Sequence, residues 1–213
     1  MKPPPQNILI FGFSHSGTNI LKTIMAKSPS VLVSPGSTEL MSPSEDLIRE
    51  AKIKSKKYTL VKATQHTAQK KDKNTYLPDA GNHYKTVFIM RDPAYIYSSI
   101  NRRFGGNIPP THQFTIYEKV AAWFTQTQIN KTPDFYHIKY EDMFANNYEK
   151  LMDLFKNLGI DHSMDIVSHG NKSDQSPPAH GSYHNSFRQW QLTQPFENMN
   201  CPSKLQLTPQ QRD

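Results

Sequence analysis

The sequence predicts an α/β fold, a single domain in which a central parallel sheet is flanked by helices. Short apolar runs that suit buried strands alternate with segments of helical periodicity, an order that favours a parallel sheet. The expected strands are 8–11, 31–33, 58–64, 85–90 and 135–140. A length of 213 residues suits one such domain with a sizeable core. We therefore expect one domain over residues 1–213, irregular from about residue 163 and with its last helix cut short.

Charge and cysteine content narrow the possible partners. The formal net charge of +7 favours anionic partners, although a solvated basic surface gives the same balance. Cys201 is the single cysteine, so an intrachain disulfide is excluded. No apolar run is long enough for a signal peptide or a membrane span, and we expect a soluble, cytoplasmic protein.

The first strand runs into a loop that suits an anion. Gly12 and Gly17 bracket four residues, and an apolar-periodic helix follows at once, so backbone N–H groups and the helix dipole converge there. The spacing is that of a Walker A loop, but Thr18-Asn19 stand where Lys and Ser or Thr would serve a γ-phosphate and Mg²⁺. The loop therefore predicts phosphate binding without NTP hydrolysis. An ordinary strand–turn–helix corner is the alternative.

The next elements place an acid near this loop. A helix is expected over 18–27, ended by Pro29, with an apolar stripe of Ile20, Leu21, Ile24 and Met25. Glu39 lies in the loop after the second strand, where parallel sheets place ligands, and it is a candidate general base. The alternative is an acid near a helix start. A helix with Ser44 as N-cap should follow over 44–54.

Two further strand ends carry site candidates. Lys62 and His66 lie at the end of the third strand and are secondary candidates, since a lone His is more often structural. The fourth strand leads into Arg91, and Pro93 suits the first position of a helix that carries Ser99. Arg91 and Ser99 together can grip a phosphate, although Arg91 can equally pair with a nearby carboxylate.

The rest of the chain supplies connections and two more helices. A loop over 104–112 is long enough for a lid, and helices are expected over 115–129 and around 151–158, the second closed by Gly159. Residues 171–186 have the composition of a loop. His180 and His184 are half of a metal site at most, since neither Cys nor a suitable acid accompanies them.

Three blocks of this chain resemble the PAPS-dependent sulfotransferase family (PAPS is 3′-phosphoadenosine 5′-phosphosulfate). Residues 14–19 are similar to its 5′-phosphosulfate loop, Pro-Lys/Arg-Ser-Gly-Thr, and Arg91-Asp92-Pro93 with Ser99 to its 3′-phosphate motif. Tyr140-Glu141-Asp142-Met143 is similar to its Tyr-Glu-Asp-Leu segment. Each block is common by itself, whereas the three in this order are specific. The resemblance covers about residues 7–160 and implies the P-loop-like sulfotransferase fold.

The resemblance implies transfer of a sulfuryl group from PAPS to a hydroxyl of a glycan, peptide or small molecule, with no metal required and no nucleic-acid partner. The phosphosulfate would lie on Ser14, His15, Ser16, Gly17, Thr18 and Asn19. Arg91 and Ser99 would hold the 3′-phosphate, with Arg188 as a substitute for the Arg-Lys-Gly triplet that this chain lacks. Glu39 matches the base of the carbohydrate and tyrosylprotein branch, which the chain resembles more than the small-molecule branch.

One departure bears on catalysis. His15 stands where the family has Lys or Arg, and with an ordinary pKa of about 6.5 a His is only partly charged at neutral pH. Lys62 or Lys22 can compensate for the missing charge. Two other functions stay open: a P-loop nucleotide kinase, and a non-catalytic module that binds a nucleotide or polyanion.

Overall fold

The computed structural model describes residues 3–35, 39–66, 84–103 and 110–164, with Asn198, Asn200 and Leu205. Its described strands form one parallel sheet in the order β2-β3-β1-β4-β5. The expected α/β fold with a central parallel sheet is therefore confirmed. The strands are β1 Gln6–Gly12, β2 Val31–Val33, β3 Tyr58–Thr64, β4 Tyr84–Met90 and β5 Phe135–Lys139.

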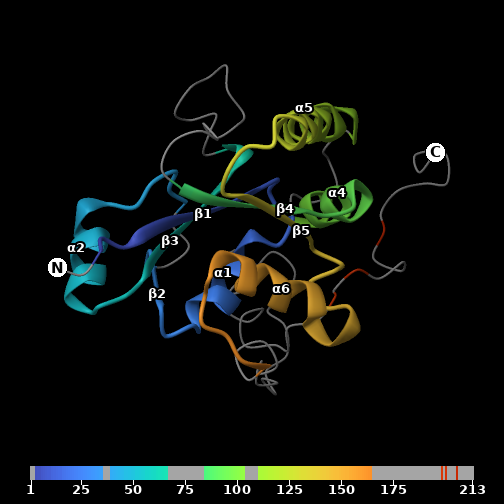
Figure 1. Ribbon diagram of the computed structural model, residues 1–213. Helices are drawn as coiled ribbons and strands as arrows, with labels where there is room; N and C mark the ends of the chain where they lie inside the picture. Colours follow the sequence, from blue (N-terminus) through green and yellow to red (C-terminus); the bar gives the residue numbers. More distant parts are fainter. Residues whose placement is uncertain are drawn as a thin grey trace.

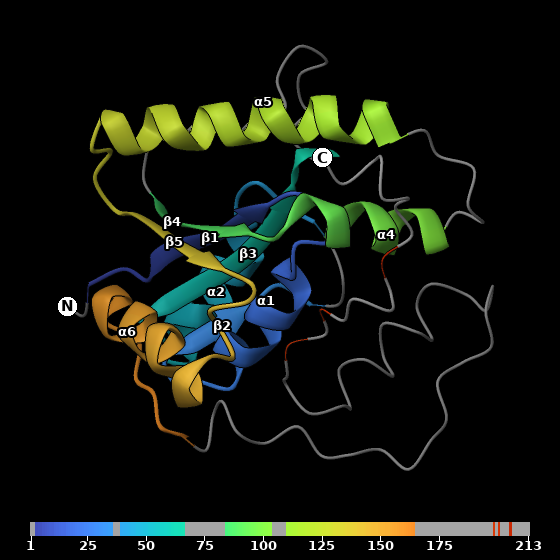
Figure 2. The same cartoon turned by 90° about the vertical axis from the view of Figure 1, so that its right-hand side faces the viewer.

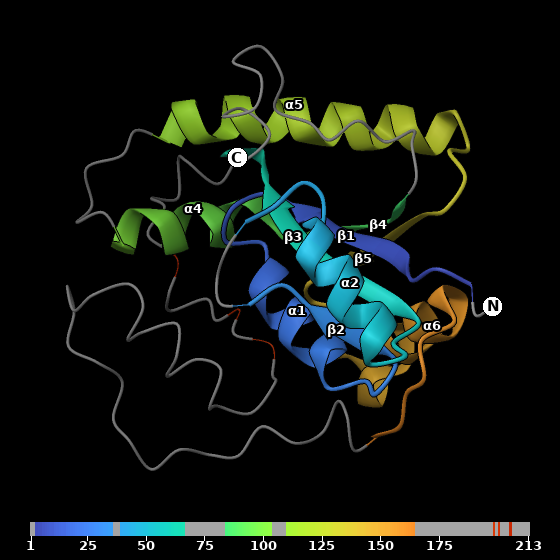
Figure 3. The same cartoon turned by 90° about the vertical axis from the view of Figure 1, so that its left-hand side faces the viewer.

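Helices cover both faces of the sheet (Figures 1 and 2). The described helices are α1 Thr18–Ala26, α2 Glu45–Ile53, α4 Pro93–Arg103, α5 Pro110–Ile129 and α6 Glu149–Leu158. One apolar core joins α1 and α6 to the sheet, and a second joins α2, α4 and α5 to the opposite face. Figure 3 shows α1 and α5 on opposite sides of the sheet, with α2 in front of its β2–β3 edge.

The sequence signals for helix ends act as expected at three places. Ser44 caps α2 by accepting the N–H of Leu47 at 3.2 Å, and Pro93 begins α4. Gly159 closes α6 in the left-handed conformation, with φ 72°. These signals are local, which is why the sequence alone located them.

Two expectations about helices were wrong in detail. α5 begins at Pro110 instead of residue 115, because Pro is favoured at a first helical position. The expected lid over 104–112 is therefore shortened, and its residues 104–109 lie outside the described part. On α1, Ile20 is only half-buried, whereas Lys22 is 6% exposed and belongs to the buried side. Periodicity of apolar residues could not find a buried lysine.

Parallel strands bring their carboxyl ends to one edge of the sheet. The loop after β1 lies at the centre of that edge, because β1 is the middle strand, and Gly12 is in register with Thr64 of β3 and Ile89 of β4. The described segments that follow the strands at this edge are 13–17, 34–35, 39–40, 65–66, 91–92 and 140–142. Each expected site residue in the described part lies in or next to one of them, on α1 or α4, or, for Lys62, near the end of β3.

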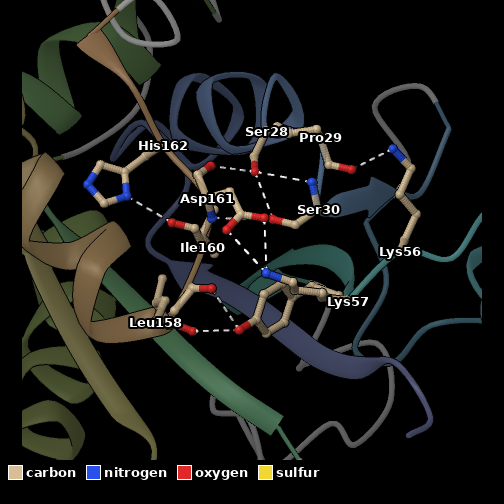
Figure 4. A network of polar contacts seen from close by, with 11 residues as sticks. Ser28, Pro29, Ser30, Lys56, Lys57, Leu158, Ile160, Asp161 and His162 are labelled. Carbon is tan, nitrogen blue, oxygen red and sulfur yellow. Dashed lines mark hydrogen bonds and ion pairs between the residues drawn. The ribbon is translucent and has the colours of Figure 1, made fainter. Parts of the chain in front are cut away.

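The opposite edge is held by polar contacts to the end of α6 (Figure 4). The Tyr58 hydroxyl, at the start of β3, donates to the carbonyl of Leu158 at 3.0 Å. Lys57 pairs with Asp161 at 3.1 Å, and the Ser28 hydroxyl donates to the Asp161 carbonyl at 2.6 Å. These contacts lie at the opposite end of the strands from the loop after β1, and they stabilise the fold.

Candidate anion-binding and transfer site

The loop between β1 and α1 has the backbone that an anion cradle requires. His15 has φ 67° and Gly17 has φ 106°, so the chain passes through the left-handed region twice before α1 begins. His is among the few non-glycine residues that are enriched there. The first N–H groups of a helix have no partner within it, and those of α1 therefore face the mouth of this loop. Asn19 and its neighbour Thr18 form the first turn of α1.

Gly17 is required at its position for two reasons. Its φ of 106° disfavours any side chain, and an added Cβ would lie 2.5 Å from Cδ2 of Tyr140. Tyr140 is almost fully buried, and its ring also lies 4.3 Å below the guanidinium of Arg91. Tyr140 thus lies between the first and second sequence blocks, and it holds them against each other.

His15 connects the two expected phosphate-binding groups. Its Nδ1 lies 2.8 Å from the Ser99 hydroxyl on α4, and its backbone carbonyl accepts a hydrogen bond from Nη1 of Arg91 at 3.0 Å. Two blocks that lie more than seventy residues apart in the sequence therefore meet at one residue. The imidazole of His15, at the position compared above with a Lys or Arg, is therefore directed toward Ser99 on α4.

Arg91 is held on its other side by Asn200. The Asn200 carboxamide oxygen accepts from Nε at 2.8 Å and from Nη2 at 2.5 Å. Asn200 in turn donates to Oε1 of Glu141 at 2.6 Å, and the same oxygen accepts the N–H of Asp92 at 3.2 Å. Two neutral acceptors, the Asn200 carboxamide and the His15 carbonyl, therefore orient the guanidinium.

Glu39 lies on the end of β3 and not at a helix start. Its Oε1 lies 3.1 Å from Nζ of Lys62, and its Oε2 accepts from the Thr64 hydroxyl at 2.8 Å. The side chain of Lys62 is 1% exposed, while that of Glu39 is 26% exposed. Both oxygens are fixed by the strand, and the carboxylate still reaches the surface. The helix-entry alternative for Glu39 does not describe this geometry.

Lys22 adds a second buried amine on the same face of the sheet. Its Nζ donates to the Ser34 carbonyl at 2.8 Å, at the end of β2. Burial and the charge of Lys62 lower the pKa of Lys22 from 10.5 to about 8. Lys22 and Lys62 thus concentrate positive charge beside the carboxyl ends of β2 and β3. An arriving anion would relieve their repulsion.

Two buried polar atoms near the loop have no hydrogen-bond partner among the described residues. They are the hydroxyl of Ser16 and the amide nitrogen of Gln65, and both side chains are fully buried. The Ser16 hydroxyl lies over Gly12, where an added Cβ would meet it at 2.6 Å. Gln65 accepts the N–H of Ser14 with its other end, at 2.7 Å. Buried polar atoms without a partner are rare in folded proteins, so both atoms need an explanation.

The remaining candidates are dispersed. His66 is exposed one residue beyond Gln65. Arg188 lies outside the described residues, as do His180, His184 and the loop over 171–186. In the described part, no group of three His, Cys, Asp or Glu side chains could hold a metal ion. None of the helices described there combines the length and apolar character needed to span a membrane.

Comparison with known proteins identifies the fold. The chain is similar to the crystal structure of mouse sulfotransferase SULT7A1 complexed with PAP, with a TM-score of 0.55 and 15% identity, over 97% of this chain and 80% of that one. The chain has the sulfotransferase fold. No family model matches the sequence, and a search of curated proteins found no match. At this identity the likeness shows the fold alone.

Sequence reasoning missed four residues of this site. Gln65, Thr64, Tyr140 and Asn200 contact the loop, Glu39 or Arg91, and none was a candidate. Thr64 and Gln65 carried a usable signal, since polar residues ended an otherwise buried strand at the ligand-binding edge. Asn200 lies more than a hundred residues from Arg91, and its sequence context gave no signal.

Proposed function

We propose that the protein is a PAPS-dependent sulfotransferase that acts on an acceptor hydroxyl. The observation that carries this proposal is the meeting of two anion sites at His15. The loop before α1 suits one anionic group, and Arg91 with Ser99 suits a second one beside it. A nucleotide with separate 5′ and 3′ anionic groups matches two adjoining sites, whereas a single phosphate fills only one.

The residues present fit such a nucleotide. The N–H groups of Gly17, Thr18 and Asn19 at the start of α1 would hold the 5′-phosphosulfate. Arg91 and Ser99 would hold the 3′-phosphate, and the phosphate would join or replace Asn200 on the guanidinium. The orphan donor of Gln65 and the buried amines of Lys22 and Lys62 supply further complementarity to negative charge.

PAPS would supply an activated sulfuryl group. The bond from its sulfur to the 5′-phosphate oxygen would break as a bond from the same sulfur to the acceptor oxygen forms, and PAP would leave. The chain would contribute a base and a cationic environment. Glu39 would take the acceptor proton, because Lys62 and Thr64 hold its carboxylate at this edge and the side chain is still partly exposed. Lys22 and Lys62 would stabilise charge at the phosphate side, the task that His15 performs only when protonated.

The proposal also covers the class of acceptor and the domain organisation. A net charge of +7 favours an acidic glycan or peptide over a neutral phenol. Glu39 as base matches the carbohydrate and tyrosylprotein branch of the family. The likeness to the mouse enzyme extends over 97% of the chain, which supports one sulfotransferase domain over residues 1–213. The PAP in that enzyme's crystal supports the choice of nucleotide for this chain.

The test is sulfate transfer from radiolabelled PAPS to a panel of glycans, peptides and phenols. The proposal expects labelled product with at least one acidic acceptor, without added metal. Binding of PAP with no transfer to any acceptor would favour a non-catalytic nucleotide-binding module. Turnover of ATP with Mg²⁺ would favour a nucleotide kinase. Failure to bind PAP at all would contradict the proposal.

A further inference from the structure

Gln65 is a buried polar side chain at the ligand-binding edge that the roles above do not explain. It follows the last residue of β3, a strand that is buried along its whole length. Its own side chain is fully buried as well. A glutamine carries two donors and one acceptor, and burying any of them without a partner destabilises the folded state. Its position therefore needs an explanation.

One end of the carboxamide has a clear task. Oε1 accepts the N–H of Ser14 at 2.7 Å, so the side chain ties the start of the loop to the end of β3. This bond also fixes the orientation of the amide, because only the oxygen can accept an N–H. The NH₂ group is left facing elsewhere, and it has no hydrogen-bond partner among the described residues.

The position of Gln65 indicates which group its NH₂ would meet. Its neighbour Thr64 binds Glu39, the proposed base, while Gln65 itself binds Ser14 of the loop. Gln65 therefore connects the strand end beside the residue that would take the acceptor proton to the loop that would hold the phosphosulfate. In a direct transfer, the group that moves occupies the space between these two.

We propose that the NH₂ group of Gln65 donates a hydrogen bond to an oxygen of the transferred sulfonate, while its carbonyl oxygen positions the loop. This inference rests on the proposed function and deepens it. A side chain that only held the loop to the end of β3 would need only its carbonyl oxygen. The orphan donor is what distinguishes a ligand-binding residue from a structural one.

The experiment compares PAPS, which carries the sulfonate, with PAP, which lacks it. In protein labelled with ¹⁵N-glutamine, the Gln65 side-chain amide signal is assigned by its loss in Gln65→Met. The signal should shift on addition of PAPS and move much less on addition of PAP. An equal response to both nucleotides, or no response to either when both bind, would overturn the inference.

Calorimetry gives the second readout. Gln65→Met removes the tether and the donor together, so both nucleotides should bind less tightly. Loss of the tether affects both nucleotides alike, so it cancels in the ratio of the PAP dissociation constant to the PAPS dissociation constant. This ratio should be about tenfold lower in Gln65→Met than in wild type, because the variant lacks the charge-assisted hydrogen bond to the sulfonate. Gln126→Met on the exposed side of α5 is the matched control and should leave the ratio unchanged. A ratio within twofold of wild type in Gln65→Met contradicts the inference alone. Wild-type protein that binds neither nucleotide contradicts the proposed function itself.

Discussion

Lys22→Met should stabilise the protein and weaken its hold on anions. The wild-type amine is buried on the inner side of α1, close enough to Lys62 for the two charges to repel. Methionine has a similar length and fills the same space without a charge. If the buried charge serves to bind an anion, its removal should raise the stability of the ligand-free protein and lower the affinity for the anion.

The magnitude follows from the pKa. Burial and Lys62 lower the pKa of Lys22 from 10.5 to about 8, and one pKa unit corresponds to about 1.4 kcal/mol. The charged amine therefore costs the folded state at most about 3.5 kcal/mol below pH 8. Methionine also loses the hydrogen bond to the Ser34 carbonyl, which costs about 1 kcal/mol. A net stabilisation of about 1–2 kcal/mol is expected at pH 7.

The sign of the pH dependence is fixed by the same shift. Between pH 8 and 10.5 the unfolded chain holds the Lys22 proton and the folded protein does not, so the wild type gains stability as the pH rises. The advantage of the variant should therefore disappear across this window. Urea unfolding of both proteins at pH 7, 8, 9 and 10 measures it, with Lys52→Met on the exposed side of α2 as control. A variant that is less stable at pH 7, or a difference that does not change with pH, would refute the reasoning.

Three more substitutions test the loop and the proposed chemistry. Gly17→Ala should destabilise the protein by about 2 kcal/mol or more and abolish PAP binding, because the new Cβ meets Tyr140; thermal melting and calorimetry measure both. Glu39→Gln should lower the rate of sulfate transfer by about 10²–10⁴ with PAP affinity within twofold of wild type. Adding Lys62→Met to it removes the buried amine that loses its ion pair with Glu39, so a double variant that folds normally and regains activity would exclude Glu39 as base. His15→Lys should retain or raise transfer, and complete loss would show a specific role for the imidazole.

The sequence predicted most of the sheet and few of the side-chain contacts between its loops. Strands and helix ends follow from local signals such as the apolar run before Gly12, the cap at Ser44 and the proline at 93. Arg91 and Ser99 were predicted from their positions at the end of β4 and on the helix that follows it, which is also a local signal. The parallel direction of the strands followed from the alternation of strands and helices, whereas the pairing of β1 with β3 and β4 was not predicted.

The contacts that unite the site depend on side chains from distant segments. Nothing near Tyr140 in the sequence indicates that its ring supports Arg91, and nothing near His15 indicates that its imidazole meets Ser99. Lys22 was expected beside a buried stripe and not within it, because a helical pattern of apolar residues gives no weight to a lysine. Such contacts depend on tertiary packing, and no local pattern in the sequence indicates them.

The central claim is that two adjoining sites bind one nucleotide by its 5′ and 3′ ends. The most direct measurement is calorimetric binding of PAP and of adenosine 5′-phosphate, which differ only in the 3′-phosphate, to wild type and to Ser99→Ala. We predict that wild type prefers PAP at least tenfold and that Ser99→Ala reduces this preference, because the hydroxyl beside Arg91 and His15 is lost. Equal affinity of the wild type for both nucleotides would contradict the claim.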